Sequence, residues 1–301
     1  MPRKHSRLIG IAAFAAVAAL GLAGCAGGGS TSSGGAAASD DRYSSEDQPL
    51  HIWSDNRPHS EILQFIIDND LLPDDVELEI TLADYSINEN QTLEDGDVDA
   101  TYIDHIPFFE ADTEQRGITD LEVAAEVHIE PQGIYSSKYD SIDEIPDGAT
   151  IGTPDNVTNF ARALFLLQSA GLIELDRTYD GGKLTGDDLL ITEDNIVSNP
   201  KNIQLLKVAD NAQLALQLQD VDAAVLQGNS ALGVDLSPAK DALKLESSTN
   251  GNPYVNVLII PTALKDDKRV KALSEALESQ EVADFITETY DGSVIPVNHV
   301  D

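Results

Sequence analysis

Two short apolar segments, each following a helix-like run and ending in polar or aromatic residues, dominate the pattern of this chain. The first, 97–109, reads Asp-Val-Asp-Ala-Thr-Tyr-Ile-Asp-His-Ile-Pro-Phe-Phe, and the second, 220–229, repeats its Asp-Val-Asp-Ala start. Each predicts a turn followed by a short buried strand. Ligands of open α/β sheets bind just beyond the carboxyl ends of the strands. The two units therefore predict two α/β lobes whose strand ends face one cleft.

The rest of the chain alternates between strand and helix periodicity. The expected elements are strand 51–53, turn 57–60, helix 61–72, strand 76–82, helix 90–95, extended run 121–134, strand 149–153, helix 160–172, strand 203–208, helix-like run 211–218, extended run 254–260, and a final helix 268–289 with a break after 277. This alternation predicts mixed, mostly parallel sheets flanked by helices, with right-handed crossovers.

The two extended runs are long enough to pass from one lobe to the other. The sequence therefore predicts an α/β, two-lobed architecture with two hinge crossings, near Pro131 and Ile260. The first lobe would contain 49–131 plus 261–301, and the second 132–260. No repeat of 20–50 residues supports a solenoid.

The amino terminus has the pattern of a bacterial lipoprotein signal. Basic residues precede an apolar run that ends in Leu-Ala-Gly at 22–24, directly before Cys25, the only cysteine. We expect a signal peptide over 1–24 and lipidation of Cys25, where two acyl chains suffice for lasting membrane attachment. A signal-anchor helix with an incidental cysteine is the alternative. Residues 25–48, rich in Gly, Ser and Ala and then acidic, are predicted to form a disordered tether.

The chain has 53 acidic and 18 basic residues, a net charge of −35. Such a charge disfavours nucleic acid and anionic lipid surfaces as partners. Since the acids are spread along the whole chain, we interpret them as a hydrated surface suited to solubility or high salt. A role in attracting cations is the alternative.

The clearest candidate site is the strand 149–153, the loop 155–159 and the following helix. Thr158 or Asn159 is suited to cap that helix, and Arg162 is expected in its first turn. Free first-turn amides and a guanidinium together form a receptor for a carboxylate. An ordinary surface arginine is the alternative.

Two further groups follow the predicted strands. Tyr102, His105 and Phe108 could surround an apolar ligand side chain, since aromatic faces suit a thioether; ordinary core aromatics are the alternative. Gln227 and Asn229 follow the second strand, and their amides could hold an ammonium or a carboxylate. Polar turn residues are the alternative there.

Signatures of catalysis are absent from the sequence. It has no Gly-x-Ser-x-Gly motif, the segment 181–185 lacks phosphate-loop spacing, and the Asp95/Asp97/Asp99 cluster lacks the later positions of a calcium loop. We expect neither an enzyme nor a cofactor. A zinc- or manganese-capturing lipoprotein stays open because four histidines, His51, His59, His105 and His128, lie in one half beside many carboxylates, although without paired spacing.

Many ordered blocks between 51 and 296 resemble one known family. They are Pro-His-Ser-Glu-Ile-Leu at 58–63, Gly-Asp-Val-Asp-Ala at 96–100, His-Ile-Pro-Phe at 105–108, Val-His-Ile-Glu-Pro at 127–131, Gly-Ile-Tyr-Ser at 133–136, Pro-Asp-Gly-Ala-Thr-Ile at 146–151, Thr-Asn at 158–159, Arg-Ala-Leu at 162–164, Asn-Pro-Lys-Asn at 199–202, Pro-Ala-Lys-Asp-Ala-Leu at 238–243 and Pro-Tyr-Val-Asn-Val at 253–257. The chain thus resembles the NlpA/MetQ family of methionine-binding lipoproteins, the substrate-binding components of D/L-methionine ABC importers.

The resemblance implies a two-lobed, type II-like periplasmic-binding fold that closes on a free amino acid. The site it implies is Arg162 on the ligand carboxylate, Gln227 and Asn229 on the amino and carboxylate groups, Tyr102, His105 and Phe108 around the side chain, and Asn159 beside Arg162. It also implies a monomer outside the cytoplasm, held to the membrane by lipid on Cys25 and delivering methionine to an ABC permease with its ATPase.

The chain departs from the family pattern at Trp53, Ile103, Asp104, Gln132, Gln227 and Ser230. Methionine is therefore the default ligand, and D-methionine, a small peptide or another apolar amino acid remain alternatives. Loss of the transport role, leaving an adhesive or signalling lipoprotein, is a further alternative.

Overall fold

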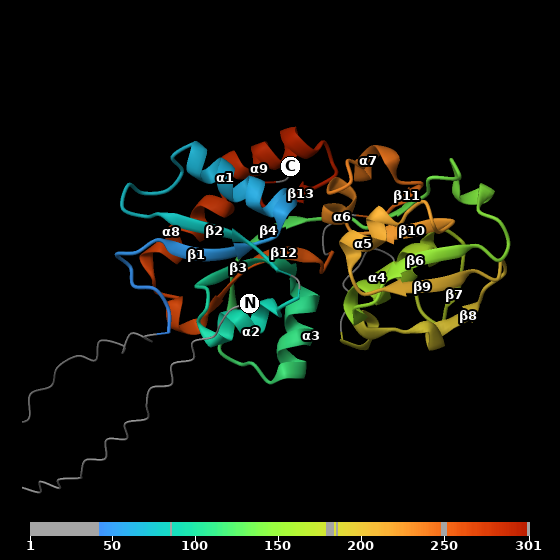
Figure 1. Cartoon of the computed structure of the whole chain (residues 1–301), viewed down its shortest axis with the longest axis horizontal. Coiled ribbons are helices and arrows are strands. Elements are labelled where there is room, and N and C mark those ends of the chain that lie inside the picture. The colour runs from blue at the N-terminus through green and yellow to red at the C-terminus, as the bar shows by residue number, and fades with distance from the viewer. Residues whose placement is uncertain (1–41, 85, 179–183, 185, 248–251, 300–301) are drawn as a thin grey trace, which may run out of the picture. The chain divides into compact units, whose positions relative to one another are not determined.

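The structure is a computed structural model that describes residues 42–84, 86–178, 184, 186–247 and 252–299 (Figure 1). The signal peptide, Cys25 and the tether up to residue 41 lie outside these residues. In the part of the chain that is described, no helix is both long and apolar enough to cross a membrane.

The first sheet has six strands in the order β13-β4-β12-β3-β1-β2. Their bounds are β1 (Leu50–Ser54), β2 (Leu78–Leu82), β3 (Ala100–His105), β4 (Leu121–Ile129), β12 (Val255–Pro261) and β13 (Ile295–Pro296). Strand β1 is parallel to β2 and β3, whereas β12 is antiparallel to β3 and β4.

The second sheet has five strands in the order β11-β5-β10-β6-β9. Their bounds are β5 (Gly133–Tyr135), β6 (Thr150–Pro154), β9 (Gln204–Val208), β10 (Ala223–Leu226) and β11 (Lys244–Leu245), and a separate pair joins β7 (Glu174–Leu175) to β8 (Ile196–Ser198). Strand β6 is parallel to β9 and β10, and β5 is antiparallel to β10.

Helices cover both sheets. Those of the first lobe are α1 (Glu61–Asp68), α2 (Glu89–Asp95), α3 (Ile106–Arg116), α8 (Lys268–Leu277) and α9 (Gln280–Tyr290); those of the second are α4 (Val157–Ser169), α5 (Asn211–Leu216), α6 (Gly228–Leu232) and α7 (Pro238–Asp241). Alternation along β1 sends Ile52 into the core beneath α1, α8 and α9, and Trp53 into the opposite core with Leu93 of α2. Figure 1 shows these helix groups on opposite sides of the first sheet.

The predicted two-lobed α/β fold is confirmed, with differences at particular elements. Helix α3 is missing from the sequence-based prediction, which treats Phe108 as part of a strand end. Pro107 favours the first turn of this helix because its fixed backbone angle suits that position, and His105 caps the helix by accepting a hydrogen bond from the amide of Phe108. The chain also returns to the first sheet at Val255, ahead of the expected boundary at 260, since all of β12 pairs with β4.

Residues 42–48 do not continue the predicted tether, because they pack against the folded domain. Tyr43 is buried, and the backbone amide of Ser44 donates to Asp99 Oδ1 at 2.8 Å. The fully buried Arg269 donates to the carbonyl oxygens of Ser44, Ser45 and Gln48, each at 2.9 Å. A buried guanidinium requires acceptors for its five donors, and this segment supplies several of them. We call residues 42–49 the docked segment.

Gly96 provides a test of this docking. It ends α2 with φ 82°, and an added Cβ would lie 2.7 Å from Arg42 Cβ in the docked segment. Gly117 ends α3 with φ 73° and has open space around it. Alanine at either position costs about 1–2 kcal/mol for the left-handed backbone. We expect Gly96→Ala to cost clearly more than Gly117→Ala in urea unfolding, because only Gly96→Ala also displaces the docked segment. Equal costs would argue against tight docking.

Candidate functional site

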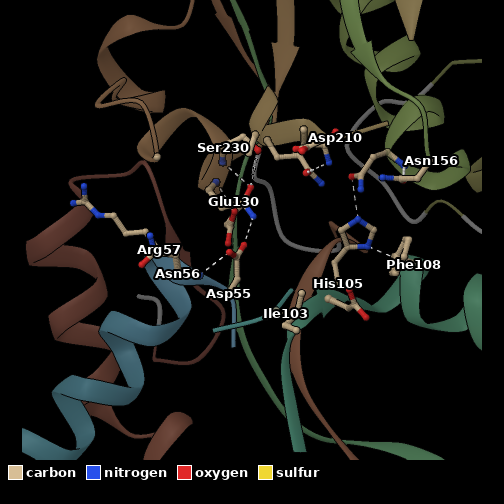
Figure 2. A pocket seen from close by; sticks show the side chains of 18 of the residues that line it. Asp55, Asn56, Arg57, Ile103, His105, Phe108, Glu130, Asn156, Asp210 and Ser230 are labelled. Carbon is tan, nitrogen blue, oxygen red and sulfur yellow. Dashed lines mark hydrogen bonds between the residues drawn. The ribbon is translucent and has the colours of Figure 1, made fainter. Parts of the chain in front are cut away.

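A cavity of about 1110 Å³ opens at the carboxyl ends of strands from both sheets. Residues that follow β1, β3, β6 and β10 line it, which is the position predicted for a ligand site in two facing α/β lobes. Figure 2 shows Asp55, Asn56 and Glu130 on one side of the cavity, and His105, Phe108 and Asn156 on the other.

His105 and Phe108 line the cavity from the first lobe, as the sequence predicts. His105 Nε2 lies 3.0 Å from Asn159 Oδ1 on α4, a contact that joins the two lobes. Its ring meets the edge of Tyr254 at a centroid distance of 5.2 Å. Burial, followed by the nearby charge of Arg162, lowers the pKa of His105 to about 3. A neutral imidazole beside Phe108 forms a weakly polar wall suited to an apolar side chain.

Tyr102 does not line the cavity. It is buried in the core of the first lobe, and its hydroxyl lies 2.7 Å from His128 Nδ1. Successive side chains of a strand point to opposite faces, so Ile103 lines the cavity while Tyr102 points into the core. The prediction that Tyr102 surrounds a ligand side chain is therefore wrong for this structure.

The helix that carries Arg162 begins earlier than predicted. Asn156 is its N-cap, accepting the backbone amide of Asn159 at 3.0 Å, so neither Thr158 nor Asn159 is the cap. With Val157 as the first helical residue, Arg162 lies in the second turn. Asn156, Asn159 and Arg162 all line the cavity. The predicted residues thus reach the site, but the free first-turn amides lie ahead of Arg162.

Arg162 is already paired with an acid. Its Nε donates to Glu246 Oε1 at 2.9 Å and Oε2 at 3.0 Å, and its Nη2 donates to Glu246 Oε2 at 2.5 Å and to the Glu130 carbonyl at 2.7 Å. The guanidinium also lies over the Tyr254 ring at 4.3 Å. Glu246 therefore already occupies the guanidinium edge formed by Nε and Nη2. This corrects the prediction that Arg162 binds both oxygens of a ligand carboxylate. Among the described residues, only Nη1 of this guanidinium has no hydrogen-bond partner.

Asn229 joins the lobes on the other side of the cavity. Its backbone amide donates to Glu130 Oε2 at 2.7 Å and its Nδ2 to Asp55 Oδ2 at 2.5 Å. Gln227 lines the cavity nearby and accepts from Asn211 Nδ2 at 2.6 Å. Both predicted amides reach the cavity. In this structure Asn229 is bound to acids, so acids as well as amides form this corner.

Three acidic residues at the site escaped the sequence analysis. Asp55 directly follows β1, so the strand-end rule that selected Gln227 could have found it. Glu130 lies in an extended apolar run, and burial raises its pKa to about 7. Glu246 is 84 positions from Arg162, and no local pattern connects them.

The wall of the cavity is strongly acidic. Its carboxyl groups belong to Asp55, Asp84, Glu89, Asp104, Glu130 and Asp210. Its two arginines are paired, Arg57 with Glu61 and Arg162 with Glu246. Although burial raises the pKa of Glu89, Asp104 and Glu130, the excess of acidic over unpaired basic groups suits a ligand that carries an ammonium group. Behind Glu130, His59 and His128 bring metal-type donor atoms to within 4.8 Å of its carboxylate and of each other.

Four of the departures from the family pattern also line the cavity: Ile103, Asp104, Gln227 and Ser230. Trp53 packs in the core, and Gln132 is buried with its Nε2 3.3 Å from the Asn159 carbonyl. The sequence differences are thus concentrated where they can alter ligand choice.

Two α/β lobes with a cavity at their facing strand ends define a solute-binding protein. The family model described as NlpA lipoprotein matches residues 52–298. The chain belongs to the NlpA lipoprotein family.

Similar proteins agree with this assignment. The methionine-binding lipoprotein MetQ of Bacillus subtilis is 39% identical over 218 residues, which cover 72% of this chain and 76% of that protein. The D-methionine-binding lipoprotein MetQ of Escherichia coli is 33% identical, covering 73% of this chain and 77% of that one. The solved structure of a nutrient-binding protein from Burkholderia cenocepacia bound to methionine matches with a TM-score of 0.74 and 33% identity, over 82% of this chain and 99% of that one.

Proposed function

We propose that this protein captures methionine or a close analogue between its two lobes and delivers it to an ABC importer. The observation that carries the proposal is the cavity at the facing strand ends, with Phe108 and His105 on one lobe and amides of Asn159 and Gln227 on the other. The methionine-related names of relatives across most of the chain support this choice of ligand. We assign the protein a binding role without catalysis.

The acidic corner of the cavity is suited to the ligand's ammonium group. Glu130 and Asp55 both contact Asn229, so an ammonium placed there would meet carboxylate oxygens from the hinge and the first lobe. Charge-assisted hydrogen bonds of this kind contribute about 1.5–3 kcal/mol each.

The carboxylate of the ligand would lie on the Arg162 side. Nη1 of Arg162 and the side-chain amide of Asn159 are the donors that the second lobe offers there. The Glu246 pair does not remove this role, because it holds the guanidinium plane fixed while leaving one nitrogen for the ligand. Preorganised donors bind more tightly since less freedom is lost.

The apolar side chain of the ligand would then pack against Phe108 and Ile103. Burying a methionine side chain contributes roughly 1.5–3 kcal/mol. Together with a few charged hydrogen bonds, less the cost of ordering, this reaches the approximately −8 kcal/mol of micromolar binding.

Closure would occur at the two crossings between the lobes. The first is short and lies between the end of β4 and the start of β5, next to Glu130. The second begins at Glu246, the partner of Arg162, directly after β11. Hinge movements of this kind are absorbed by a few residues at element ends. Both crossings thus begin at an acid of the site, Glu130 or Glu246. A ligand that contacts these acids or their partners would therefore couple its binding to closure of the lobes.

Lipid on Cys25 would hold the domain at the outer surface of the cell membrane as a monomer. The Gly-, Ser- and Ala-rich sequence after Cys25 would serve as the tether, and the docked segment is the point where the folded domain begins. The permease and its ATPase would take the ligand from the closed form.

Phe108→Ala tests the side-chain contact. We expect methionine affinity to fall about tenfold, since loss of an aromatic–sulfur contact costs about 0.3–1.5 kcal/mol and apolar area is lost with it. Calorimetric titration measures this. Phe65→Ala is the matched control, because Phe65 stacks on Phe285 at 4.2 Å and does not line the cavity. Equal affinity losses in the two variants would contradict the placement.

A thermal-shift screen tests the choice of ligand. The panel contains all common amino acids, D-methionine and methionine-containing dipeptides. It is broad because the cavity is large and its lining departs from the family pattern at Ser230. We expect methionine or one of its analogues to give the largest rise in melting temperature. A larger rise with an unrelated amino acid would replace methionine as the ligand, and no rise with any compound would argue against a transport role.

A further inference from the structure

A buried cluster behind the cavity contains groups that amino-acid binding does not use. It consists of His59 in the turn before α1, His128 near the end of β4, and Glu130 in the first crossing. From this cluster we propose that His59 Nδ1, His128 Nε2 and Glu130 Oε1 bind a divalent metal ion of the zinc type. The proposed methionine site lies on the cavity side of Glu130, and neither proposal depends on the other.

The spacing of the three donor atoms fits a small metal ion. Glu130 Oε1 lies 3.5 Å from His59 Nδ1 and 3.0 Å from His128 Nε2, and all three atoms are within 4.8 Å of one another. Tetrahedral zinc, with bonds of about 2.0–2.2 Å, places neighbouring ligand atoms roughly 3.3–3.6 Å apart. Two of the observed separations lie near this range, and the third, within 4.8 Å, must shorten for an ion to bind.

One of these three proposed ligand atoms, His59 Nδ1, has no other role in the described structure. His59 is fully buried, and its Nδ1 has no hydrogen-bond partner among the described residues. Its Nε2 lies 3.2 Å from the amide oxygen of Asn256, which accepts a hydrogen bond and so places the ring hydrogen on Nε2. Nδ1 then presents a lone pair toward the Glu130 carboxylate. A metal ion or a proton between two such electron-rich atoms stabilises them side by side.

The outer contacts of the two histidines are those of metal ligands. Asn256 orients His59, and the Tyr102 hydroxyl lies 2.7 Å from His128 Nδ1. Metal-binding histidines generally hold their second nitrogen in this manner, which fixes the ring and its tautomer. Tyr102, which does not reach the cavity, thereby acquires a role.

Glu130 connects this cluster to the second lobe. Its Oε1 faces the histidines, while its Oε2 accepts the backbone amide of Asn229. Gly228 lies close behind, since an added Cβ would meet Glu130 Cβ at 2.9 Å. A metal ion held by Oε1 would fix the Glu130 side chain and with it the contact between the crossing and α6. We therefore expect the ion to stabilise the arrangement of the two lobes.

Metal titration of the purified full chain in detergent tests the proposal. The protein carries Cys25→Ser to remove its only thiol, has no histidine tag, and is stripped with a chelator that is then removed. Zinc chloride titrated into it should bind at about one high-affinity ion per chain, raise the melting temperature, and be retained through gel filtration. His59→Gln should lose this ion. His51→Gln is the matched control, because His51 is a partly exposed histidine of the same sheet, and it should keep the ion.

The same measurements can overturn the proposal. Retention of the ion by His59→Gln, or its loss in His51→Gln, would assign binding to surface histidines and carboxylates. If His59→Gln fails to fold, cobalt(II) added to the stripped parent protein decides. A strong visible band typical of tetrahedral nitrogen and oxygen ligands is expected, and only the weak absorption of hydrated cobalt would refute the site. Methionine is absent from these experiments, so their failure leaves the proposed transport function untouched.

Discussion

Arg162→Ala is expected to destabilise the protein by about 3–5 kcal/mol, because it leaves a buried carboxylate without its partner. Glu246 is only 9% exposed, and Arg162 provides three of its hydrogen bonds. The cost of an uncompensated buried charge exceeds the net value of the pair itself. Urea unfolding followed by circular dichroism measures the change.

Two variants separate this effect from simple loss of a positive charge. Arg116→Ala removes an exposed arginine paired with Asp112 one helical turn away and should cost less than about 1 kcal/mol. The double variant Arg162→Met with Glu246→Leu removes both buried charges and should recover most of the lost stability. A cost for Arg162→Ala no greater than that for Arg116→Ala would contradict the described pair.

The double variant also isolates the role of Arg162 in binding. It is expected to keep the fold but lacks the guanidinium nitrogen Nη1, which we propose binds the ligand carboxylate. Methionine affinity should therefore fall at least about tenfold, or about 1.4 kcal/mol. Unchanged affinity in this stable background would remove Arg162 from the ligand site.

Arg269→Ala is expected to have a comparable effect on stability, about 3–5 kcal/mol, through a different part of the fold. Arg269 is fully buried, pairs with Asp267 at 2.7 Å, and donates to several carbonyl oxygens of the docked segment. Its removal leaves Asp267 without its ion-pair partner and takes one hydrogen-bond donor from each of these carbonyls. Besides the loss of stability, we expect trypsin to cleave after Arg42 much faster, because the segment is no longer held.

Lys271→Ala is the control for this experiment. Lys271 lies on the same helix and forms an exposed pair with Asp266 at 3.0 Å, so its loss should change stability by less than about 1 kcal/mol. The cleavage rate after Arg42 should stay unchanged in this variant. Equal cleavage rates in Arg269→Ala and Lys271→Ala would show that Arg269 does not hold the docked segment.

Sequence periodicity predicted most of the fold because the elements concerned have strong local patterns. Strand β2 alternates apolar and polar residues, α8 and α9 are amphipathic, and β12 is apolar apart from Asn256. Helix α3 was missed because it has little apolar periodicity and depends on Pro107 and the His105 cap to begin. The docked segment was missed for a different reason. Its composition is polar, and its order comes from Arg269, which lies more than 200 positions away.

The site was partly predictable for the same reason. His105, Phe108, Gln227 and Asn229 follow predicted strands, and all of them line the cavity. Tyr102 was misassigned because the strand-end rule does not state which face a residue occupies, and a one-residue step along β3 reverses it. The Arg162–Glu246 pair joins α4 to the second crossing and exists only after the chain has folded. No local pattern contains such a contact.

Calorimetric titration of the purified protein with L-methionine is the most direct test of the central claim, that the cavity between the lobes binds this amino acid. We expect about one methionine per chain, a dissociation constant of roughly micromolar or tighter, and a marked loss of affinity in Asn229→Ala, which removes the side-chain contact to Asp55 at the acidic corner. The absence of saturable heat, or saturable binding unaffected by both Asn229→Ala and Phe108→Ala, would contradict it.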